Sequence, residues 1–231
     1  APDRTDTDDV TESVRRYPGS SPDPSKFKAP ARNDRFTGRL VDLQRLRDQL
    51  RDVRRAVVTQ IPVALHGLGG VGKTQLAIEY VHRFAPDYDV VWWIDASQPQ
   101  FVDSALIDLG RRLNLVTSAT LESARATLDG LESPELTSRW LLVYDNAEDP
   151  DAIKDLIPTG GAGHVLITSR NKDWETRAQT VPVDVFRRAE SITHLLGRTS
   201  ALTREQADQV AGTLGDLPIA IAAAGAYLAE T

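Results

Sequence analysis

The chain has 231 residues, 41 per cent of them hydrophobic and 26 per cent charged, a composition typical of a globular protein with one large domain or two small ones. It contains no cysteine, which excludes a disulfide scaffold, a thiolate zinc site and a cysteine nucleophile. The formal net charge of −6 argues against a globally basic nucleic-acid surface, and no apolar run reaches the roughly 20 residues of a membrane helix.

Residues 1–34 differ in composition from the rest of the chain. They hold five of the 13 prolines, seven acidic residues, six basic residues and few large apolar ones. Such a segment cannot bury enough apolar surface to offset its loss of conformational entropy on folding. We therefore expect residues 1–34 to form a flexible linker, with a short helix near Val10–Arg16 or an arm that docks on the following domain as the alternatives.

From residue 35 to residue 183 the chain alternates helical and strand patterns. Apolar residues at helical spacing, such as Leu43, Leu46 and Leu50, predict helices, and short apolar runs predict strands. This alternation favours an α/β domain with a parallel sheet covered on both faces. The expected elements, in chain order, are a helix at Leu40–Val53, a strand at Pro62–His66, a helix at Thr74–Phe84, a strand at Val90–Ile94, helices at Phe101–Leu113 and Leu121–Leu131, and strands at Trp140–Tyr144, His164–Thr168 and Thr180–Val183.

After Val185 the pattern changes to helices alone, which we expect at Ala189–Leu196, Arg204–Leu214 and Pro218–Leu228. Residues 184–231 should therefore form a small helical subdomain. Methionine is absent, including at position 1, and the last stretch is apolar. We expect the chain to be a fragment of a longer protein.

The sharpest motif lies between a predicted strand and a predicted helix. It reads Gly67-Leu68-Gly69-Gly70-Val71-Gly72-Lys73-Thr74 and fits the P-loop pattern of Gly, four residues and Gly-Lys-Ser/Thr. Glycines let successive backbone N–H groups point at phosphate oxygens, and the following helix offers its positive end to the same anion. We expect Lys73 to reach the β- and γ-phosphates of a nucleotide and the Thr74 hydroxyl to bind Mg²⁺. A glycine turn with a stray lysine is the alternative.

A second motif, Trp140–Asp145, is an apolar strand that ends in an acid. The carboxyl ends of parallel strands face the phosphates in such folds, so Asp145 is placed to hold Mg²⁺. Asn146 follows, where many ATPases carry a second acid, and an amide cannot accept a proton from water. We interpret the nearby Glu148 and Asp149 as the acidic start of the next helix, with activation of water by one of them as the alternative.

The strand at His164–Thr168 ends in Thr168-Ser169-Arg170 and brings a hydroxyl and a guanidinium to the same edge. A guanidinium matches the geometry of a phosphate group, so Arg170 is a candidate sensor of the γ-phosphate. A surface salt bridge is the alternative. The candidate catalytic residues are thus Lys73, Asp145 and Arg170.

With these motifs in order, the sequence resembles the NB-ARC branch of the STAND signal-transduction NTPases. It is most similar to actinobacterial members that carry tetratricopeptide repeats after the nucleotide-binding unit. The sequence departs from the family pattern at Asn146, which stands in place of the usual second acid. It also departs at Asp216, which is inserted after the glycine of the motif that begins at Gly215. The matching stretches are Phe36-Thr37-Gly38-Arg39, Gly67–Thr74 continued by Gln75-Leu76-Ala77, Leu141–Asp145, Ile167–Arg170 and Gly215-Asp216-Leu217-Pro218-Ile219-Ala220.

The resemblance implies a five-stranded sheet of order 5-1-4-3-2 and ADP or ATP held with Mg²⁺ between the α/β domain and the helical subdomain. It also implies a resting state with ADP bound, and self-oligomerisation when the full-length protein is activated by an unidentified protein or ligand. By the same resemblance Thr37 and Arg39 lie near the ribose and adenine, Gln75 belongs to the nucleotide site, and Pro218 packs against the base.

Together these features predict a nucleotide-dependent switch that controls a signalling or defence response through flanking domains and hydrolyses ATP slowly. We expect it to be cytoplasmic, with neither a membrane nor a nucleic acid as a direct partner. A metabolic P-loop kinase or a motor ATPase is the alternative, although a kinase needs an arginine-rich lid. A scaffold with an inactive site is a third class, against which Lys73, Thr74 and Asp145 argue.

Overall fold

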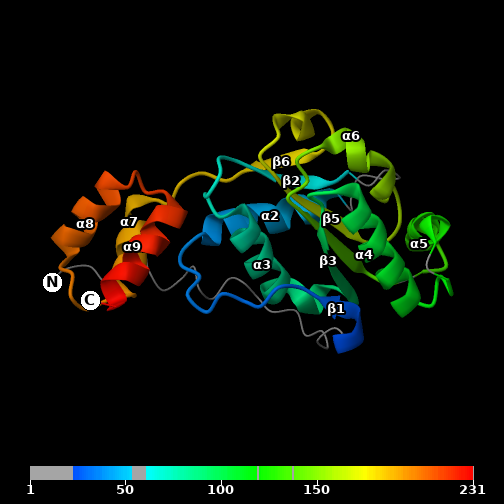
Figure 1. Ribbon diagram of the computed structural model, residues 1–231, viewed down its shortest axis with the longest axis horizontal. Coiled ribbons are helices and arrows are strands. Elements are labelled where there is room, and N and C mark those ends of the chain that lie inside the picture. Colours follow the sequence, from blue (N-terminus) through cyan, green and yellow to red (C-terminus); the bar gives the residue numbers. More distant parts are fainter. Residues whose placement is uncertain (1–22, 54–60, 119, 137, 231) are drawn as a thin grey trace.

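A parallel sheet of six strands forms the centre of the molecule, with helices on both of its faces (Figure 1). The computed structural model describes residues 23–53, 61–118, 120–136 and 138–230. The strands lie in the order β1-β3-β4-β5-β2-β6, and each neighbouring pair is parallel. Their bounds are β1 Phe27–Lys28, β2 Val63–His66, β3 Val90–Asp95, β4 Trp140–Asp145, β5 His164–Ser169 and β6 Gln179–Pro182.

The five strands predicted from the sequence take the expected order 5-1-4-3-2, which here is β6-β2-β5-β4-β3. The expected number of strands is corrected to six, because β1 pairs with β3 at the edge of the sheet. Phe27 lies opposite Val91, and Lys28 lies opposite Trp92. A strand of two residues is too short to show an alternating pattern, and it falls in the segment that composition assigned to a linker or arm.

The two faces of the sheet bury different side chains, since successive residues of a strand point to opposite sides. In β4, Leu141 and Val143 pack with the apolar sides of helices α2 and α3, whereas Trp140, Leu142 and Tyr144 pack with those of α4 and α5. The sheet is therefore covered on both faces, as its continuous apolar strands predict. The elements around it are α2 Leu40–Val53, α3 Lys73–Phe84, α4 Pro99–Arg112, α5 Leu121–Glu132, α6 Pro150–Ile153 and the 3₁₀ turns η1 Pro24–Lys26, η2 Ala85–Asp87, η3 Lys154–Leu156 and η4 Lys172–Thr176.

Three further helices follow the sheet and form a subdomain with a core of its own. They are α7 Arg188–Leu196, α8 Arg204–Thr213 and α9 Pro218–Glu230. Ile192 and Leu195 of α7, the small residues Ala207 and Ala211 of α8, and Ile221 of α9 make this core. The subdomain stands beside the amino end of α3 at one end of the molecule (Figure 1). No helix in the described part of the chain combines the length and apolar character needed to cross a membrane.

Residues 23–34 take the form of an arm that docks on the domain. Besides the pairing of β1 with β3, the Arg32 guanidinium forms two hydrogen bonds of 2.8 and 2.9 Å with the carboxylate of Glu79 on α3. His82 Nε2, on the same helix, lies 2.9 Å from the carbonyl oxygen of Pro30. Because α3 is the helix that follows the P-loop, the arm is fastened to the element that carries the loop. Residues 1–22 lie outside the described part of the chain.

Glu79 is the centre of this attachment. Its carboxylate is 2 per cent exposed and binds both Arg32 and Arg83, the latter at 2.6 Å. Burial alone would raise the pKa of Glu79, but the hydrogen bonds and charges of the two arginines together hold this pKa below its ordinary value. The ionised form of Glu79 therefore stabilises the folded state.

We expect Glu79→Gln to lower the free energy of unfolding at pH 7 by about 1–3 kcal/mol, because two arginines lose their charged acceptor. Asp108→Asn, which weakens the exposed pairs with Lys28 and Arg112, is the control and should change it by no more than about 0.5 kcal/mol. Urea unfolding measures both. A depressed carboxyl pKa adds stability above an unfolded pKa of about 4.3, and that stability is lost as the pH falls through the folded pKa. The gap between wild type and Glu79→Gln should thus shrink below about pH 4, and a gap that is constant with pH would contradict the assignment.

Candidate functional site

The P-loop connects β2 to α3 at the carboxyl edge of the sheet. Gly70 has a φ of 78°, in the left-handed region that favours glycine. A Cβ atom at Gly70 would lie 2.6 Å from Cγ2 of Ile219 on α9, so the loop can touch α9 only because the residue is glycine. The N–H of Ile219 donates to the Gly70 carbonyl at 3.2 Å. The helical subdomain therefore closes directly on the phosphate-binding loop.

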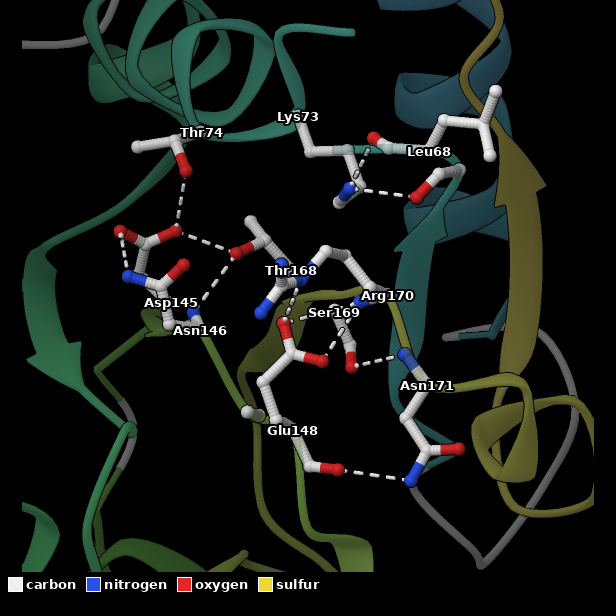
Figure 2. A network of polar contacts seen from close by, with 12 residues as sticks. Leu68, Lys73, Thr74, Asp145, Asn146, Glu148, Thr168, Ser169, Arg170 and Asn171 are labelled. Carbon is white, nitrogen blue, oxygen red and sulfur yellow. Dashed lines mark hydrogen bonds and ion pairs between the residues drawn. The ribbon is translucent and has the colours of Figure 1, made fainter. Parts of the chain in front are cut away.

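Lys73 opens α3, and its ammonium group turns back to the loop. Nζ donates to the carbonyl oxygens of Gly67 at 2.8 Å and Leu68 at 2.9 Å (Figure 2). Burial lowers the pKa of Lys73, and the charge of Arg170 lowers it further, whereas Glu148 and Asp145 act in the opposite direction. Neutral carbonyls are thus the partners of this cation, which leaves its charge available to an anion.

Three elements meet at the carboxylate of Asp145. The Thr74 hydroxyl on α3 donates to Asp145 Oδ1 at 2.8 Å, and the Thr168 hydroxyl on β5 donates to the same oxygen (Figure 2). Asp145 is buried, so these hydrogen bonds satisfy a charge that would otherwise be costly. A carboxylate oxygen beside a hydroxyl is the hard oxygen pair that Mg²⁺ takes in P-loop proteins, with water and phosphate as its remaining ligands. The residues present therefore fit the metal that the sequence predicts.

Asn146 follows Asp145 in a left-handed conformation with a φ of 61°. Asparagine tolerates this conformation better than most residues, and its N–H donates to the Thr168 hydroxyl at 3.0 Å. The side-chain amide lies 3.5 Å from Asp145 Oδ2. The residue shapes the turn after β4 and supplies no general base.

The two acids that follow Asn146 have different positions. Asp149 is the N-cap of α6 and accepts from the N–H groups of Asp151 and Ala152, which confirms the helix-start interpretation for this residue. For Glu148 that interpretation is wrong. Its carboxylate lies outside the helix and accepts from the Nε of Arg170 at 3.1 Å and from its backbone N–H at 3.3 Å.

Arg170 lies at the end of β5 beside the P-loop. A Cβ atom at Gly69 would lie 3.9 Å from Arg170 Cδ, so the side chain runs along the loop. The side chain is 65 per cent exposed, and its guanidinium is paired with Glu148. Arg170 forms the salt bridge considered as the alternative, and it also borders the phosphate loop, where a γ-phosphate sensor is expected. The two interpretations of Arg170 therefore do not exclude each other.

Arg39 turns its charged end into the protein. The residue is 6 per cent exposed, and Nη2 donates to the carbonyl oxygens of Val71 at 2.8 Å and Asp184 at 2.6 Å. Nη1 donates to Asp42 at 3.1 Å, and the backbone N–H of Arg39 donates to Glu190 at 2.7 Å. Arg39 therefore braces the P-loop, the segment after β6 and the helical subdomain against one another. The guanidinium and the backbone N–H of Arg39 are thus engaged within the protein, although the residue lines the cavity. Only its remaining atoms are free to contact ribose or adenine.

Thr37 leads to residues that the sequence analysis missed. Its hydroxyl lies 3.1 Å from Nδ1 of His194 on α7, and the His194 ring lies 6.2 Å from the ring of Phe186. Burial, and next the charge of Arg35, lower the pKa of His194, which favours the neutral ring. Neither His194 nor Phe186 belongs to a recognisable motif, so only the packing of α7 against the segment 36–39 reveals them.

These residues surround one cavity of about 830 Å³, a size typical of small-molecule sites. Of the residues predicted for the site, only Gly67, Leu68 and Asp145 do not line it. The lining consists of Ala31, Asn33, Arg35, Phe36, Thr37, Arg39, Gly69, Gly70, Val71, Gly72, Lys73, Thr74, Gln75, Asn146, Glu148, Ser169, Arg170, Phe186, His194, Pro218, Ile219 and Ala222.

We expect Arg39→Lys to lower the free energy of unfolding by about 1–3 kcal/mol, because a single ammonium group cannot reach two carbonyls and a carboxylate in the way a guanidinium fork does. Arg45→Lys, on the exposed side of α2, is the matched control and should change it by no more than about 0.5 kcal/mol. Urea denaturation compares the two variants with wild type. Equal stability of the two variants would show that Arg39 does not brace the junction.

Comparisons with known proteins agree with this geometry. The regulatory protein AfsR of Streptomyces griseus is 33% identical over 220 residues, which cover 87% of this chain and 21% of that protein. The chain thus spans about a fifth of the length of this curated relative. The STAND protein with a tetratricopeptide repeat sensor from Pyrococcus horikoshii has a TM-score of 0.52 at 16% identity, over 85% of this chain and 30% of that chain. The ORC2 protein of Aeropyrum pernix in its ADP form has a TM-score of 0.59 at 12% identity, over 88% of this chain and 65% of that chain.

At these identities the two solved structures show a shared fold and nothing more. The family assignment comes from the sequence, since the NB-ARC domain family matches residues 42–195, which run from α2 to α7 and include the P-loop, Asp145 and Arg170. The chain therefore belongs to the NB-ARC domain family.

Proposed function

We propose that this chain is the nucleotide-binding switch domain of a STAND-type regulatory protein, which binds ADP or ATP with Mg²⁺, rests with ADP bound and hydrolyses ATP slowly. One observation carries the proposal. The P-loop and the helical subdomain border the same cavity of about 830 Å³, which Thr74 lines at its phosphate end, and the Thr74 hydroxyl is hydrogen-bonded to Asp145 behind it. A cavity built from two units can respond to its ligand by changing how the units meet.

The roles of the residues at the phosphate end follow from their chemistry. Lys73 exchanges two neutral carbonyl partners for phosphate oxygens, and the N–H groups of the glycine loop bind the same oxygens. Thr74 and Asp145 would hold Mg²⁺, which would shield the negative charge of the phosphates when bound. Arg170 reaches the γ-phosphate from the end of β5. Lys73, Asp145 and Arg170 are the residues that we propose for catalysis.

The residues at the other end form the site for ribose and base. Thr37 and Phe186 bring a hydroxyl and an aromatic ring, and Pro218 opens α9 at a position where its missing N–H costs nothing. A purine needs concave and partly apolar cover, which these side chains provide. The backbone N–H of Ile219 donates to the carbonyl of Gly70 in the P-loop, so the helical subdomain is in direct contact with the phosphate-binding element. The subdomain therefore acts as a lid whose position depends on the nucleotide.

The helical subdomain also argues against the kinase alternative. The residues of the described subdomain that line the cavity are Phe186, His194, Pro218, Ile219 and Ala222, none of which is an arginine. A phosphoryl-transfer lid needs cations against the transferred group. For the full-length protein we propose a cytoplasmic location, a trigger sensed by C-terminal repeats, and self-association once the lid has moved. The named relative AfsR, a regulatory protein, supports a role in signalling.

We expect ADP to stabilise the wild-type protein and Lys73→Ala to abolish most of that effect. ADP at about 100 times its Kd adds about 2.7 kcal/mol, which shifts the Tm of a domain of this size by roughly 5–10 °C. Lys172→Ala removes an exposed lysine that does not line the cavity and should keep the full shift. Thermal melting with and without ADP and Mg²⁺ gives all three values. An undiminished shift in Lys73→Ala would overturn the assignment of the site.

We expect hydrolysis of ATP to be slow, well below the typical enzyme turnover of about 1–10³ per second. Asn146 cannot accept a proton from water, and the acid that follows it in the cavity is bound to Arg170. Release of phosphate from saturating ATP and Mg²⁺ measures the rate, with Lys73→Ala as the background. A turnover inside the typical range would show that a general base is in place.

A further inference from the structure

Glu148 forms an ion pair with Arg170, the residue whose guanidinium we propose to bind the γ-phosphate. Its carboxylate accepts from Arg170 Nε at 3.1 Å and from the Arg170 backbone N–H at 3.3 Å, as Figure 2 shows beside Lys73 and the P-loop. The side-chain amide of Asn171 donates to the carbonyl oxygen of Glu148 at 2.8 Å and holds its backbone against the end of β5. The pair is therefore positioned from both sides.

A structural duty elsewhere does not account for Glu148. The neighbouring Asp149 caps α6, so that helix has its N-cap without Glu148. Glu148 lines the cavity, and its negative charge opposes the lowering of the Lys73 pKa that burial causes. It lies at the phosphate end of the site with two cations beside it, and its side chain is 37 per cent exposed.

We propose that Glu148 sets the preference of this site for ADP over ATP by competing with the γ-phosphate for Arg170, an inference that rests on the proposed function. A nucleoside diphosphate carries no third phosphate and leaves the Glu148–Arg170 pair intact. A nucleoside triphosphate must take the guanidinium from Glu148 and place its additional negative charge beside the released carboxylate. Glu148 thus weakens binding of ATP while it leaves binding of ADP almost unchanged.

The charges around the pair give this competition its direction. Arg170 is the cation that the pair withholds, whereas Lys73 is hydrogen-bonded to two neutral carbonyls and remains available to both nucleotides. Charge-assisted hydrogen bonds to phosphate are stronger than an exposed ion pair between side chains, so a γ-phosphate can win Arg170, but with a reduced net gain. Glu148 is therefore a positioning residue that acts through Arg170. Its effect is measured as the preference of the site for ADP over ATP.

The test compares the Kd of ADP with that of the β,γ-imido analogue of ATP, both with Mg²⁺, by titration calorimetry. In Glu148→Gln the ratio of the analogue Kd to the ADP Kd should fall about three- to tenfold, while the Kd of ADP itself changes less than about twofold. Glu135→Gln removes the same charge from an exposed position that does not line the cavity and should leave the ratio unchanged.

Two further variants separate the pair from simple charge repulsion. Glu148→Asp keeps the charge but shortens the side chain, so a lower ratio in this variant shows that the contact with Arg170 matters. In an Arg170→Ala background, Glu148→Gln should change the ratio less than about twofold, because the object of the competition is gone. An equally large change in that background would overturn the proposal, as would unchanged ratios in both Glu148 variants.

The outcome for the proposed function is read separately. If wild type fails to bind ADP, the nucleotide site itself is wrong. If wild type and Glu148→Gln bind ADP alike and keep the same ratio, only the role of Glu148 is refuted. Circular dichroism confirms that each variant is folded, and should Glu148→Gln fail to fold, Glu148→Asp decides the question alone.

Discussion

The arrangement of the site depends on one oxygen atom. Oδ1 of Asp145 accepts hydrogen bonds from Thr74 at the start of α3 and from Thr168 on β5, and so ties three elements together at the carboxyl edge of the sheet. A buried carboxylate needs such partners, because an unpaired charge in the interior is very costly. The same demand that stabilises the fold holds the carboxylate and hydroxyl that suit Mg²⁺ at hydrogen-bonding distance.

A second constraint joins the two units of the chain. Arg39 links the P-loop to the segment after β6 through two carbonyls, and its backbone N–H is bound by Glu190 of α7. Gly70 permits the close approach of α9, which is secured by one backbone hydrogen bond. These contacts between the units meet at the loop. On the proposed function, a bound anion would act through them on the position of the helical subdomain.

The two cations beside the P-loop have partners of different charge. Lys73 is held by neutral groups, whereas Arg170 is held by Glu148, so the two cations differ in what an incoming phosphate must displace. A carbonyl partner is exchanged at little electrostatic cost, but a carboxylate partner is exchanged only against a competing charge. On the proposed function, this difference would distinguish between positions along a phosphate chain.

The sequence by itself determined the elements and the phosphate end of the site. Helical and strand periodicities located α2 to α5, α7 to α9 and β2 to β6, because each depends on residues a few positions apart. Lys73, Thr74, Asp145 and Arg170 could be placed together without coordinates, since parallel strands present their carboxyl ends at one edge. Local pattern and sheet geometry were sufficient for these residues.

Only the tertiary structure decided the rest. The strand β1, the inward turn of Arg39, the contact of Thr37 with His194 and the pairing of Glu148 with Arg170 join segments between 22 and 157 residues apart. None of these contacts leaves a periodic or spaced signature in the chain, because each depends on where whole elements pack. The sequence around Arg39 does not show whether its side chain binds a ligand or a buried carbonyl. The difference is set by the direction in which the fold points it.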